Sequence, residues 1–207
     1  VARRLAFALE LEQQQREGSS FRIAWEETQR AIEASPLYLG LRLPRQIDLA
    51  PLGPDPDSGL FEFCALGSGE IPPRGIDGRL QLEASSGIVL VLIPAAEPLL
   101  GREPNDALTQ ALVPYPKLDR PTLAKVKLAP YFIGKHELTQ EQWICWTGVN
   151  PSQFERNRTF SGVRIGERHP LERVSYIDAM PVLRRRGLTL PTEAQWEYAC
   201  RAGTTTR

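Results

Sequence analysis

The acidic side chains Asp55, Asp57 and Glu62 are the first candidates for chemistry, because three carboxylates fall within one short, turn-rich stretch. Carboxylates in a loop are the ligands that Ca²⁺ takes in proteins. Their spacing lacks the ligand pattern of known calcium loops, and prolines and glycines interrupt the stretch. We therefore interpret these residues as turn residues and assign no metal ligand to them.

The chain has two histidines, His136 and His169, which lie 33 positions apart. That separation matches no zinc or iron ligand spacing. His136 follows an expected strand, so a packing or surface role is favoured over a ligand role. His169 precedes Pro170, and we expect a hydrogen-bonded loop histidine there.

The three cysteines, Cys64, Cys145 and Cys200, are few, odd in number and far apart. This pattern supports neither a disulfide scaffold nor a zinc site, and it favours a reducing compartment. Cys200 lies on the apolar stripe of an expected helix. Because buried cysteines are normally inert, we do not assign it a catalytic role.

The remaining candidates are better explained by structure than by chemistry. The tryptophans Trp143, Trp146 and Trp196 are predicted core aromatics, with a substrate platform as the alternative. Glu172 and Arg173 are expected to form loop salt bridges. The run 184–186 consists of three arginines at a helix C-terminus, where it complements the dipole, and an anion site is the alternative. The sequence therefore assigns no catalytic, cofactor-binding or metal-binding residue.

These side chains must be positioned by three short helices with well-specified starts. Thr192 and Gln195 form a capping box after Pro191, and Gly203 ends that helix in the left-handed conformation. The expected core-facing stripe of this helix consists of Trp196, Ala199, Cys200 and Gly203.

The other two helices begin with the segments 139–142 and 175–178, and the second of them ends at Gly187. Pro181 leaves two alternatives for its start. If Ser175 caps the helix, Pro181 falls in the second turn. If Asp178 is the effective cap, Pro181 falls in the first turn, where proline is tolerated.

The chain before these helices divides by composition. Residues 1–34 favour two helices separated at residues 18–20, interpreted as linker helices, with a docking helix pair as the alternative. The apolar face of the second helix consists of Phe21, Ala24, Trp25, Thr28, Ala31 and Ile32. Residues 41–86 are rich in proline and glycine, which disfavour long elements, so only short extended pieces are expected at 60–63 and 78–82.

Strands are predicted further along the chain. The β-branched run 88–93 predicts a buried strand, and Pro98 shortens the following strand or confines it to an edge. Residues 102–124 read as a loop. The segments 125–128 and 131–138 are expected strands.

Composition narrows the class of protein. The 207 residues carry 25 basic and 25 acidic side chains, so nothing attracts the chain to nucleic acid or to an acidic membrane. The longest apolar run, 88–96, falls far short of the ~20 residues that span a bilayer. With Val1 first and no export signal, we expect an internal piece of a cytoplasmic protein.

Four motifs, in order, resemble the formylglycine-generating enzyme (sulfatase-modifying factor) family. They are the segments 131–143, 150–154, 169–179 and 190–203. The resemblance runs from about Gly87 to the end and covers only the N-terminal part of such a domain. We therefore expect a helical leader at 1–40, a Pro/Gly-rich linker with short strands at 41–86, and the partial family domain at 87–207.

The resemblance implies an irregular α+β fold similar to C-type lectins, here truncated and preceded by the leader. Enzymes of this family use copper and dioxygen to oxidise a cysteine of a target protein to formylglycine. Their cysteine pair and structural calcium loops belong to the later part of the domain, so copper and calcium are implied for the complete domain and the fragment is expected to be inactive. Iron-dependent sulfoxide synthases share this fold and use a companion helical domain that carries a cluster of histidine and glutamate. This class is disfavoured, because residues 1–34 contain no histidine.

Two functions remain open. One is a formylglycine-generating-type oxidoreductase, or a relative acting on another substrate, with a protein or peptide as partner. The alternative is a non-catalytic, lectin-like binding or sensor module of a multidomain bacterial signalling protein. Residues 51–63 also look similar to leaders that precede this domain in large bacterial proteins, some with an upstream serine/threonine kinase.

Overall fold

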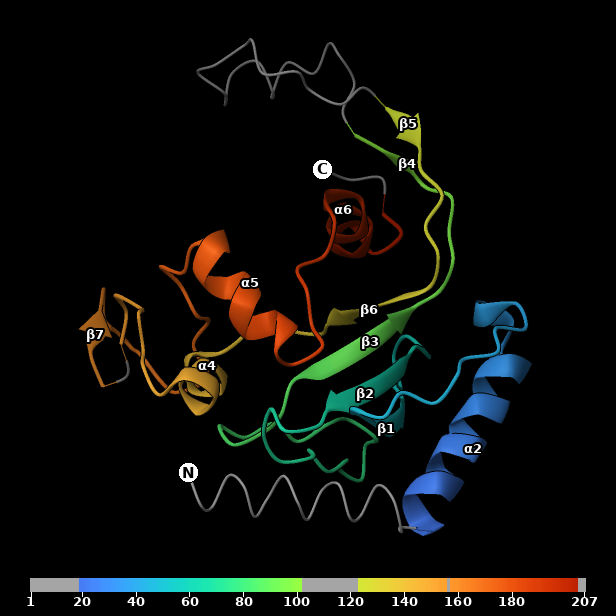
Figure 1. Ribbon diagram of the computed structural model, residues 1–207, viewed down its shortest axis with the longest axis horizontal. Coiled ribbons are helices and arrows are strands. Elements are labelled where there is room, and N and C mark those ends of the chain that lie inside the picture. The colour runs from blue at the N-terminus through green and yellow to red at the C-terminus, as the bar shows by residue number, and fades with distance from the viewer. Residues whose placement is uncertain (1–18, 102–122, 156, 205–207) are drawn as a thin grey trace. The chain divides into compact units, whose positions relative to one another are not determined.

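The computed structural model describes residues 19–101, 123–155 and 157–204 (Figure 1). These residues form two compact units. The described part of the first unit is 19–92, 132–155 and 157–190, and that of the second is 93–101, 123–131 and 191–204. Both helices and antiparallel strand pairs are present, so the predicted mixed α and β class is confirmed.

A four-stranded sheet in the order β1-β2-β3-β6 lies at the centre of the first unit. Its strands are β1 (Leu49–Pro54), β2 (Phe61–Ala65), β3 (Val89–Ile93) and β6 (Tyr131–Gly134). β2 is antiparallel to both β1 and β3. β1 was not predicted, because Pro51 and Pro54 argue against a strand. It is an edge strand with an irregularity between Pro51 and Gly53, which is where a sheet tolerates proline.

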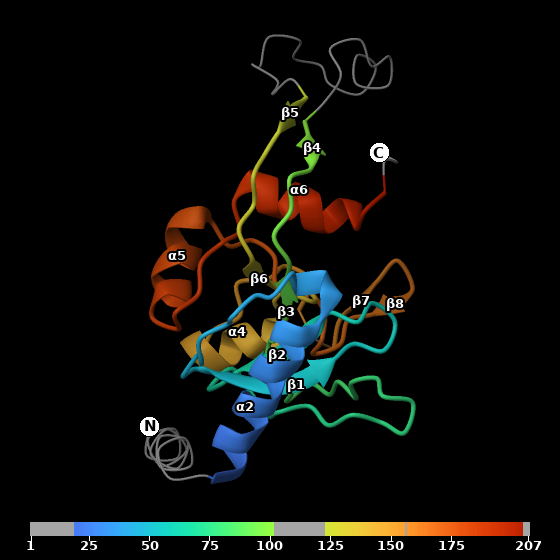
Figure 2. The same ribbon diagram turned by 90° about the vertical axis from the view of Figure 1, so that its right-hand side faces the viewer.

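Helix α2 (Ser19–Ala34) packs on this sheet and lies in front of β1 and β2 in Figure 2. Trp25, Thr28 and Ile32 are buried on one face of the helix, as the spacing predicted, whereas Ala31 of the predicted face is exposed. The helix therefore contributes to the core, which is not what the linker interpretation expected. The preceding helix expected before residue 18 lies outside the described residues.

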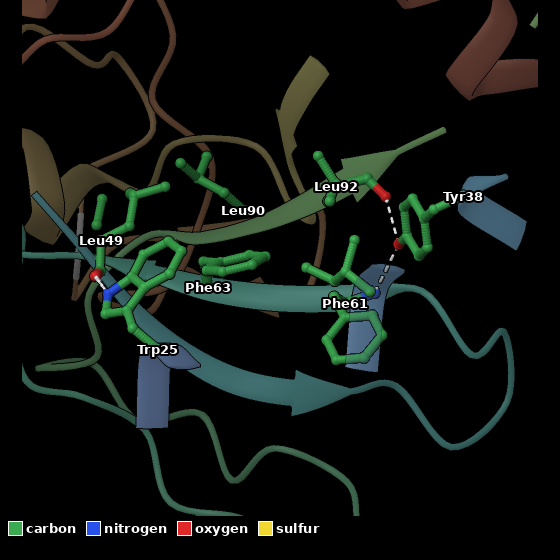
Figure 3. Close-up of a cluster of buried hydrophobic side chains, with 9 residues drawn as sticks. Trp25, Tyr38, Leu49, Phe61, Phe63, Leu90 and Leu92 are labelled. Atoms are coloured by element: carbon green, nitrogen blue, oxygen red, sulfur yellow. Dashed lines mark hydrogen bonds between the residues drawn. The ribbon is translucent and has the colours of Figure 1, made fainter. Parts of the chain in front are cut away.

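Aromatic side chains dominate the core of the first unit (Figure 3). The ring centroids of Trp25 and Phe63 are 5.5 Å apart, and those of Phe63 and Phe132 are 5.2 Å apart, edge to face. Trp25 Nε1 donates to the carbonyl of Leu49 at 3.0 Å. The core residues beside these are Ile32, Tyr38, Phe61, Ala65, Leu90 and Leu92.

Tyr38 joins two strands through its hydroxyl. It lies at the end of the 3₁₀ helix η1 (Pro36–Tyr38), donates to the Leu92 carbonyl at 2.9 Å and accepts from the Phe61 amide at 2.9 Å. Burial raises the pKa of Tyr38, against the effect of the Phe61 hydrogen bond, so the hydroxyl keeps the proton that it donates.

Two predicted helices of the first unit are present with their caps. α4 (Gln140–Thr147) has the capping box between Thr139 and Gln142. α5 (Tyr176–Arg184) is capped by the Ser175 hydroxyl, which accepts from the Asp178 amide at 3.2 Å. Ser175 is thus the cap, and Pro181 lies inside the helix. A small hairpin between them pairs β7 (Thr159–Phe160) with β8 (Val163–Arg164).

The second unit consists of the ribbon of β4 (Leu99–Leu100) with β5 (Ala124–Lys125) and the helix α6 (Glu193–Arg201). The predicted capping box of Thr192 and Gln195 is confirmed. Gly101 is held by α6, because its amide donates to Glu197 Oε1 at 3.0 Å and its carbonyl accepts from Arg201 Nη2 at 3.0 Å. Glu197 and Arg201 also pair with each other.

The expected core-facing stripe of α6 is wrong. Trp196 is 59% exposed, Cys200 is exposed, and the helix has no buried residue. The reason is that α6 contacts the rest of its unit through polar groups, including Glu197 and the Gln195 carbonyl, which accepts from the Tyr131 hydroxyl at 2.7 Å. Ala202, rather than Gly203 alone, takes the left-handed conformation at the helix end.

Some expected strands are shorter or missing. Residues 78–82 contain one isolated bridge, between Arg74 and Leu80, because the chain turns at Gly75–Gly78. The expected strand 131–138 stops at Gly134, and 125–128 retains only Lys125 and the bridge of Leu128 to Ala96. β3 was predicted correctly within one residue. None of the helices in the described ranges has the length and apolar character needed to cross a membrane.

Candidate functional site

A cavity of about 690 Å³ in the first unit brings together three segments that are far apart in sequence. They are 82–89 at the start of β3, 136–142 between β6 and α4, and 164–170 after the β7–β8 hairpin. Its volume lies within the range of small-ligand sites, ~300–1,000 Å³. Both histidines line it, although sequence spacing gave no reason to pair them.

Main-chain hydrogen bonds hold the walls of the cavity together. The Gln140 amide donates to the carbonyl of His169 at 3.0 Å, and the Leu171 amide donates to Leu138 at 2.8 Å. Arg168 Nη1 donates to the Leu82 carbonyl at 2.8 Å across the opposite side. The cavity is therefore a built feature of these loops.

His169 is a hydrogen-bonded loop histidine, as predicted. Its Nδ1 accepts from the amide of Gly166 at 2.8 Å. The same Nδ1 lies 3.2 Å from the Gly166 carbonyl, a contact whose donor and acceptor roles depend on the tautomer of the ring. His136 is exposed on the cavity wall, in agreement with the expected surface role.

The cavity lining carries both signs of charge over an apolar floor of Ile88 and Val89. The charged members are Glu83, Glu137, Glu167, Arg164 and Arg168. Such a lining can orient a polar ligand or a peptide segment, and its imidazoles and carboxylates are of the types that transfer protons. Its volume and mixed lining make it a candidate binding site.

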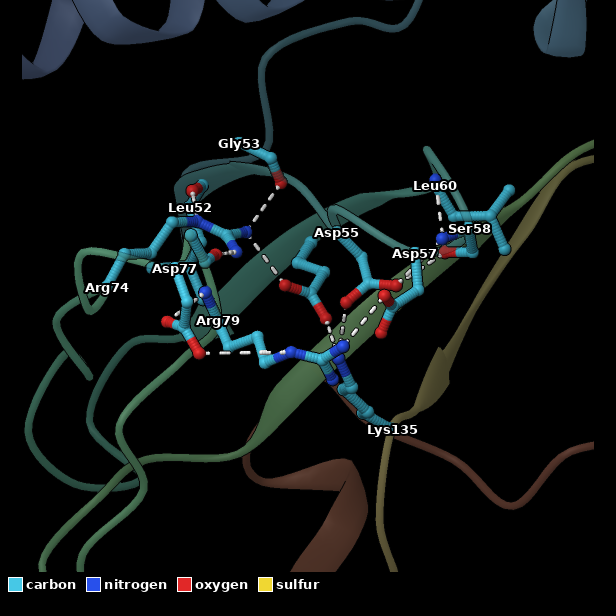
Figure 4. Close-up of polar contacts among 12 residues, drawn as sticks. Leu52, Gly53, Asp55, Asp57, Ser58, Leu60, Arg74, Asp77, Arg79 and Lys135 are labelled. Atoms are coloured by element: carbon cyan, nitrogen blue, oxygen red, sulfur yellow. Dashed lines mark hydrogen bonds and ion pairs between the residues drawn. The ribbon is translucent and has the colours of Figure 1, made fainter.

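The carboxylates at 55–62 belong to a separate polar cluster, the Glu62 cluster, defined by Asp55, Glu62, Arg74 and Lys135 (Figure 4). The Glu62 side chain is fully buried, with Arg74 Nη2 at 2.7 Å from Oε2 and Lys135 Nζ at 2.5 Å from Oε1. Lys135 Nζ also lies 3.0 Å from Asp55 Oδ1.

These pairings neutralise the acidic side chains with cations of the protein itself. Asp57 likewise pairs with Arg79 at 2.8 Å. Arg74 in addition donates to the main-chain carbonyls of Leu52, Gly53 and Gly78. The residues do not fit a calcium site, and the turn interpretation agrees with the Ser58 hydrogen bonds to Asp55.

Asp55 is expected to make the first unit sensitive to acid. Burial acts to raise its pKa, but hydrogen bonds from Ser58 and Lys135 and the charge of Lys135 lower it from 3.8 to about 2. Because the pKa is lower in the folded state than in the unfolded state, ionised Asp55 stabilises the fold at pH values above the ordinary carboxyl pKa. This contribution, about 2 kcal/mol, is lost as the pH falls from about 4 through about 2. Urea unfolding of Asp55→Asn should show less of this loss, whereas Asp57→Asn should behave like the parent chain.

Burial also makes Cys64 unreactive. It is fully buried, and burial raises the pKa of its thiol to about 11. Cys145 and Cys200 are exposed, so the expectation that Cys200 is buried is wrong. All three are free thiols.

The copper that the resemblance implies has no fitting donor set in the part of the chain that the structure describes. No group of three His, Cys, Asp or Glu side chains there is arranged to hold a metal ion. Cys64 is a protonated, buried thiol rather than a thiolate ligand. No step through copper is derived from these residues.

Alkylation provides a direct check of the cysteines. In the native chain at pH 8, iodoacetamide is expected to label Cys145 and Cys200 and to leave Cys64 unlabelled, because only the first two are exposed. Peptide mass spectrometry reports the three sites separately. Labelling of Cys64 at the rate of the other two would contradict its burial.

The other candidates have structural surroundings. Trp143 is buried, as predicted, and Trp146 is half-buried with the Arg186 guanidinium 5.7 Å from its ring centroid. Glu172 Oε1 accepts from the Phe154 amide at 2.9 Å, and within the described part of the chain this carboxylate has no ion pair. Arg173 instead donates to Gln153 Oε1 at 3.4 Å.

Comparison with known proteins decides the family. Residues 84–207, more than half of the chain, match the model of the sulfatase-modifying factor enzyme 1-like domain. The chain belongs to this family. Most residues that line the cavity lie within this family match, from Ala84 onward. Leu82 and Glu83 also line the cavity and precede the match. The α+β, C-type-lectin-like fold class that the motifs implied is the fold class of this family.

Three known proteins are similar to parts of the chain. The formylglycine-generating enzyme of Mycobacterium tuberculosis is 57% identical over 65 residues, covering 30% of the chain and 22% of that enzyme. The chaperone protein LppX of Paenibacillus barcinonensis is 29% identical, covering 38% of each chain. The uncharacterised protein YfmG of Bacillus subtilis is 30% identical, covering 37% of the chain and 18% of its own length.

These matches span well under half the length of each relative. No solved structure matches the chain at a comparable level. The match over residues 84–207 establishes the family of the chain, and the activity of the whole protein is proposed below.

Proposed function

We propose that the chain is part of a formylglycine-generating-type oxidoreductase, which oxidises a cysteine of a protein or peptide substrate with dioxygen as the oxidant. The observation that carries this proposal is the 57% identity to the mycobacterial formylglycine-generating enzyme over 65 residues. The family match over 84–207 supports it.

In this proposal the described residues bind the substrate and do not carry out the oxidation. They contain no donor set that fits copper, so the cysteine pair and copper that such an enzyme needs would be supplied by sequence other than the described residues. The cavity between 82–89, 136–142 and 164–170 is proposed to contact the substrate outside its reacting cysteine, because it combines an apolar floor with both signs of charge.

Oxygen uptake by the full-length gene product is the experiment that tests this function. With copper and a cysteine-containing peptide together, we expect dioxygen consumption that stops when either is left out. The 207-residue chain alone should give none. Peptide binding by the gene product without oxygen uptake would overturn the proposal in favour of a non-catalytic recognition module.

A further inference from the structure

The family match begins at residue 84, yet much of the first unit precedes it. α2, η1, β1 and β2 all lie before that residue. β2 pairs with β3, and residues of all four elements share one hydrophobic core with β3 and with Phe132 of β6, which lie within the match. The face of β3 and β6 in the family region is therefore covered by the residues that precede the match.

Apolar packing at this interface is extensive. On the family side, Leu90 and Leu92 of β3 and Phe132 of β6 belong to one core with residues that precede the match. Phe132 stacks edge to face on Phe63, and the carbonyl of Leu92 accepts from the Tyr38 hydroxyl. Without the preceding residues this face of the family region would be an exposed apolar surface.

Main-chain pairing crosses the same interface. β2 pairs with β3, and on the adjoining segments the Ala65 amide donates to Ile88 at 2.9 Å. The Glu70 amide donates to Ser85 at 2.8 Å, and the Gly87 amide donates to the Glu70 carbonyl at 2.8 Å. Removal of β2 would leave one edge of β3 without hydrogen-bond partners, and an exposed strand edge is prone to aggregation.

Gly87 shows how closely the two parts approach. A Cβ at this position would lie 2.7 Å from Cys64 Sγ and 2.9 Å from Ser68 Oγ, both on the side that precedes the match. These separations are shorter than Cβ atoms adopt, so an alanine here would require the Cys64 and Ser68 side chains to shift.

Charge complementarity adds a third kind of contact. Glu62 is fully buried before the match, and Lys135, within it, places its ammonium on the Glu62 carboxylate. A buried carboxylate that loses a partner cation is strongly unfavourable. Arg74 pairs with Glu62 from the part that precedes the match, and Lys135 supplies the second cation from the family region, so the cluster links the two parts.

We propose that residues 19–83 are the obligate intramolecular partner of the family region, so that the β3–β6 face folds only when a helix and an antiparallel hairpin from the same chain cover it. The functional domain of this protein then begins near Ser19 rather than at residue 84. This inference does not depend on the proposed enzymatic activity.

Cleavage within the full chain tests the proposal. A site for a specific protease is inserted at the exposed turn between Ile76 and Asp77, where the Ile76 side chain is fully solvent-accessible. After complete cleavage we expect the two pieces to co-elute on size exclusion at the intact mass and to unfold in one transition. After separation in urea, the 77–207 piece should refold cooperatively only when the 1–76 piece is added back.

A matched pair of glycine variants links the result to the interface. In the cleaved chain, Gly87→Ala should weaken association of the pieces about tenfold, the usual scale of an overpacked contact. Gly166→Ala, whose Cβ would meet its nearest neighbour at an ordinary 3.7 Å, should leave association unchanged. Native separation of the cleaved pieces, or cooperative refolding of the 77–207 piece alone, would overturn the proposal.

Discussion

Replacing Trp25 with alanine is expected to lower the free energy of unfolding of the first unit by about 3–5 kcal/mol, the usual range for a buried large aromatic. The indole is 1% exposed and packs on Phe63. Its removal also leaves the Leu49 carbonyl without the hydrogen bond from Nε1. Urea unfolding followed by far-ultraviolet circular dichroism measures the change without using tryptophan fluorescence.

The control for this variant lies on the same helix. Ile23 is 46% exposed on α2, so Ile23→Ala should lower stability by less than about 1 kcal/mol. Equal effects of the two variants would show that α2 does not pack through Trp25. The linker interpretation of this helix would then stand.

Glu62→Ala should have an effect of similar size through a different cause. The substitution leaves Arg74 and Lys135, whose side chains are only 22% and 31% exposed, without their shared counter-ion. Breaking a buried ion pair by removing one partner costs about 3–5 kcal/mol. Because both cations keep some access to water and Asp55 remains beside Lys135, we expect about 3 kcal/mol.

Urea midpoints measured at pH 7 and at low and high salt provide the readout for Glu62→Ala. The effect should persist at high salt, because a buried pair is screened much less than a surface pair. Glu27→Ala, on the exposed face of α2, is the control and should change the midpoint little. A Glu62→Ala chain as stable as the parent would mean that the cluster contributes no net stability.

The helix starts could be predicted because their signals are local. Thr139, Ser175 and Thr192 each accept from an amide three residues on, and that geometry depends only on nearby residue types. Pro181 shows the limit, since residue types alone left Ser175 and Asp178 as alternative caps. The hydroxyl contact of Ser175 decides between them.

Long-range pairing could not be predicted in the same way. Lys135 is 73 positions from Glu62, and no local pattern relates them. A signal was nevertheless present, because Glu62 interrupts the apolar run Phe61–Phe63, and a buried carboxylate needs a cation. β1 was missed because its prolines were interpreted as strand breakers, although an edge strand accepts them.

The site shows the same division. Sequence reasoning correctly gave His169 a loop hydrogen bond from its place before Pro170, and the structure shows Gly166, three residues away, as the partner. It could not bring His136 and His169 to one cavity, because three separate segments form the walls. The spacing on α6 predicted a buried stripe, whereas polar contacts of Glu197 and Arg201 determine which side faces its own unit.

Detection of a peptide aldehyde tests the central claim most directly. The full-length gene product is incubated with copper, dioxygen and a cysteine-containing peptide, and the product is captured with a hydrazide and identified by mass spectrometry. If the chain is part of a formylglycine-generating-type enzyme, the peptide gains an aldehyde at its cysteine position, and a peptide with serine at that position gains none. An unmodified cysteine, under conditions in which the gene product binds the peptide, would contradict it.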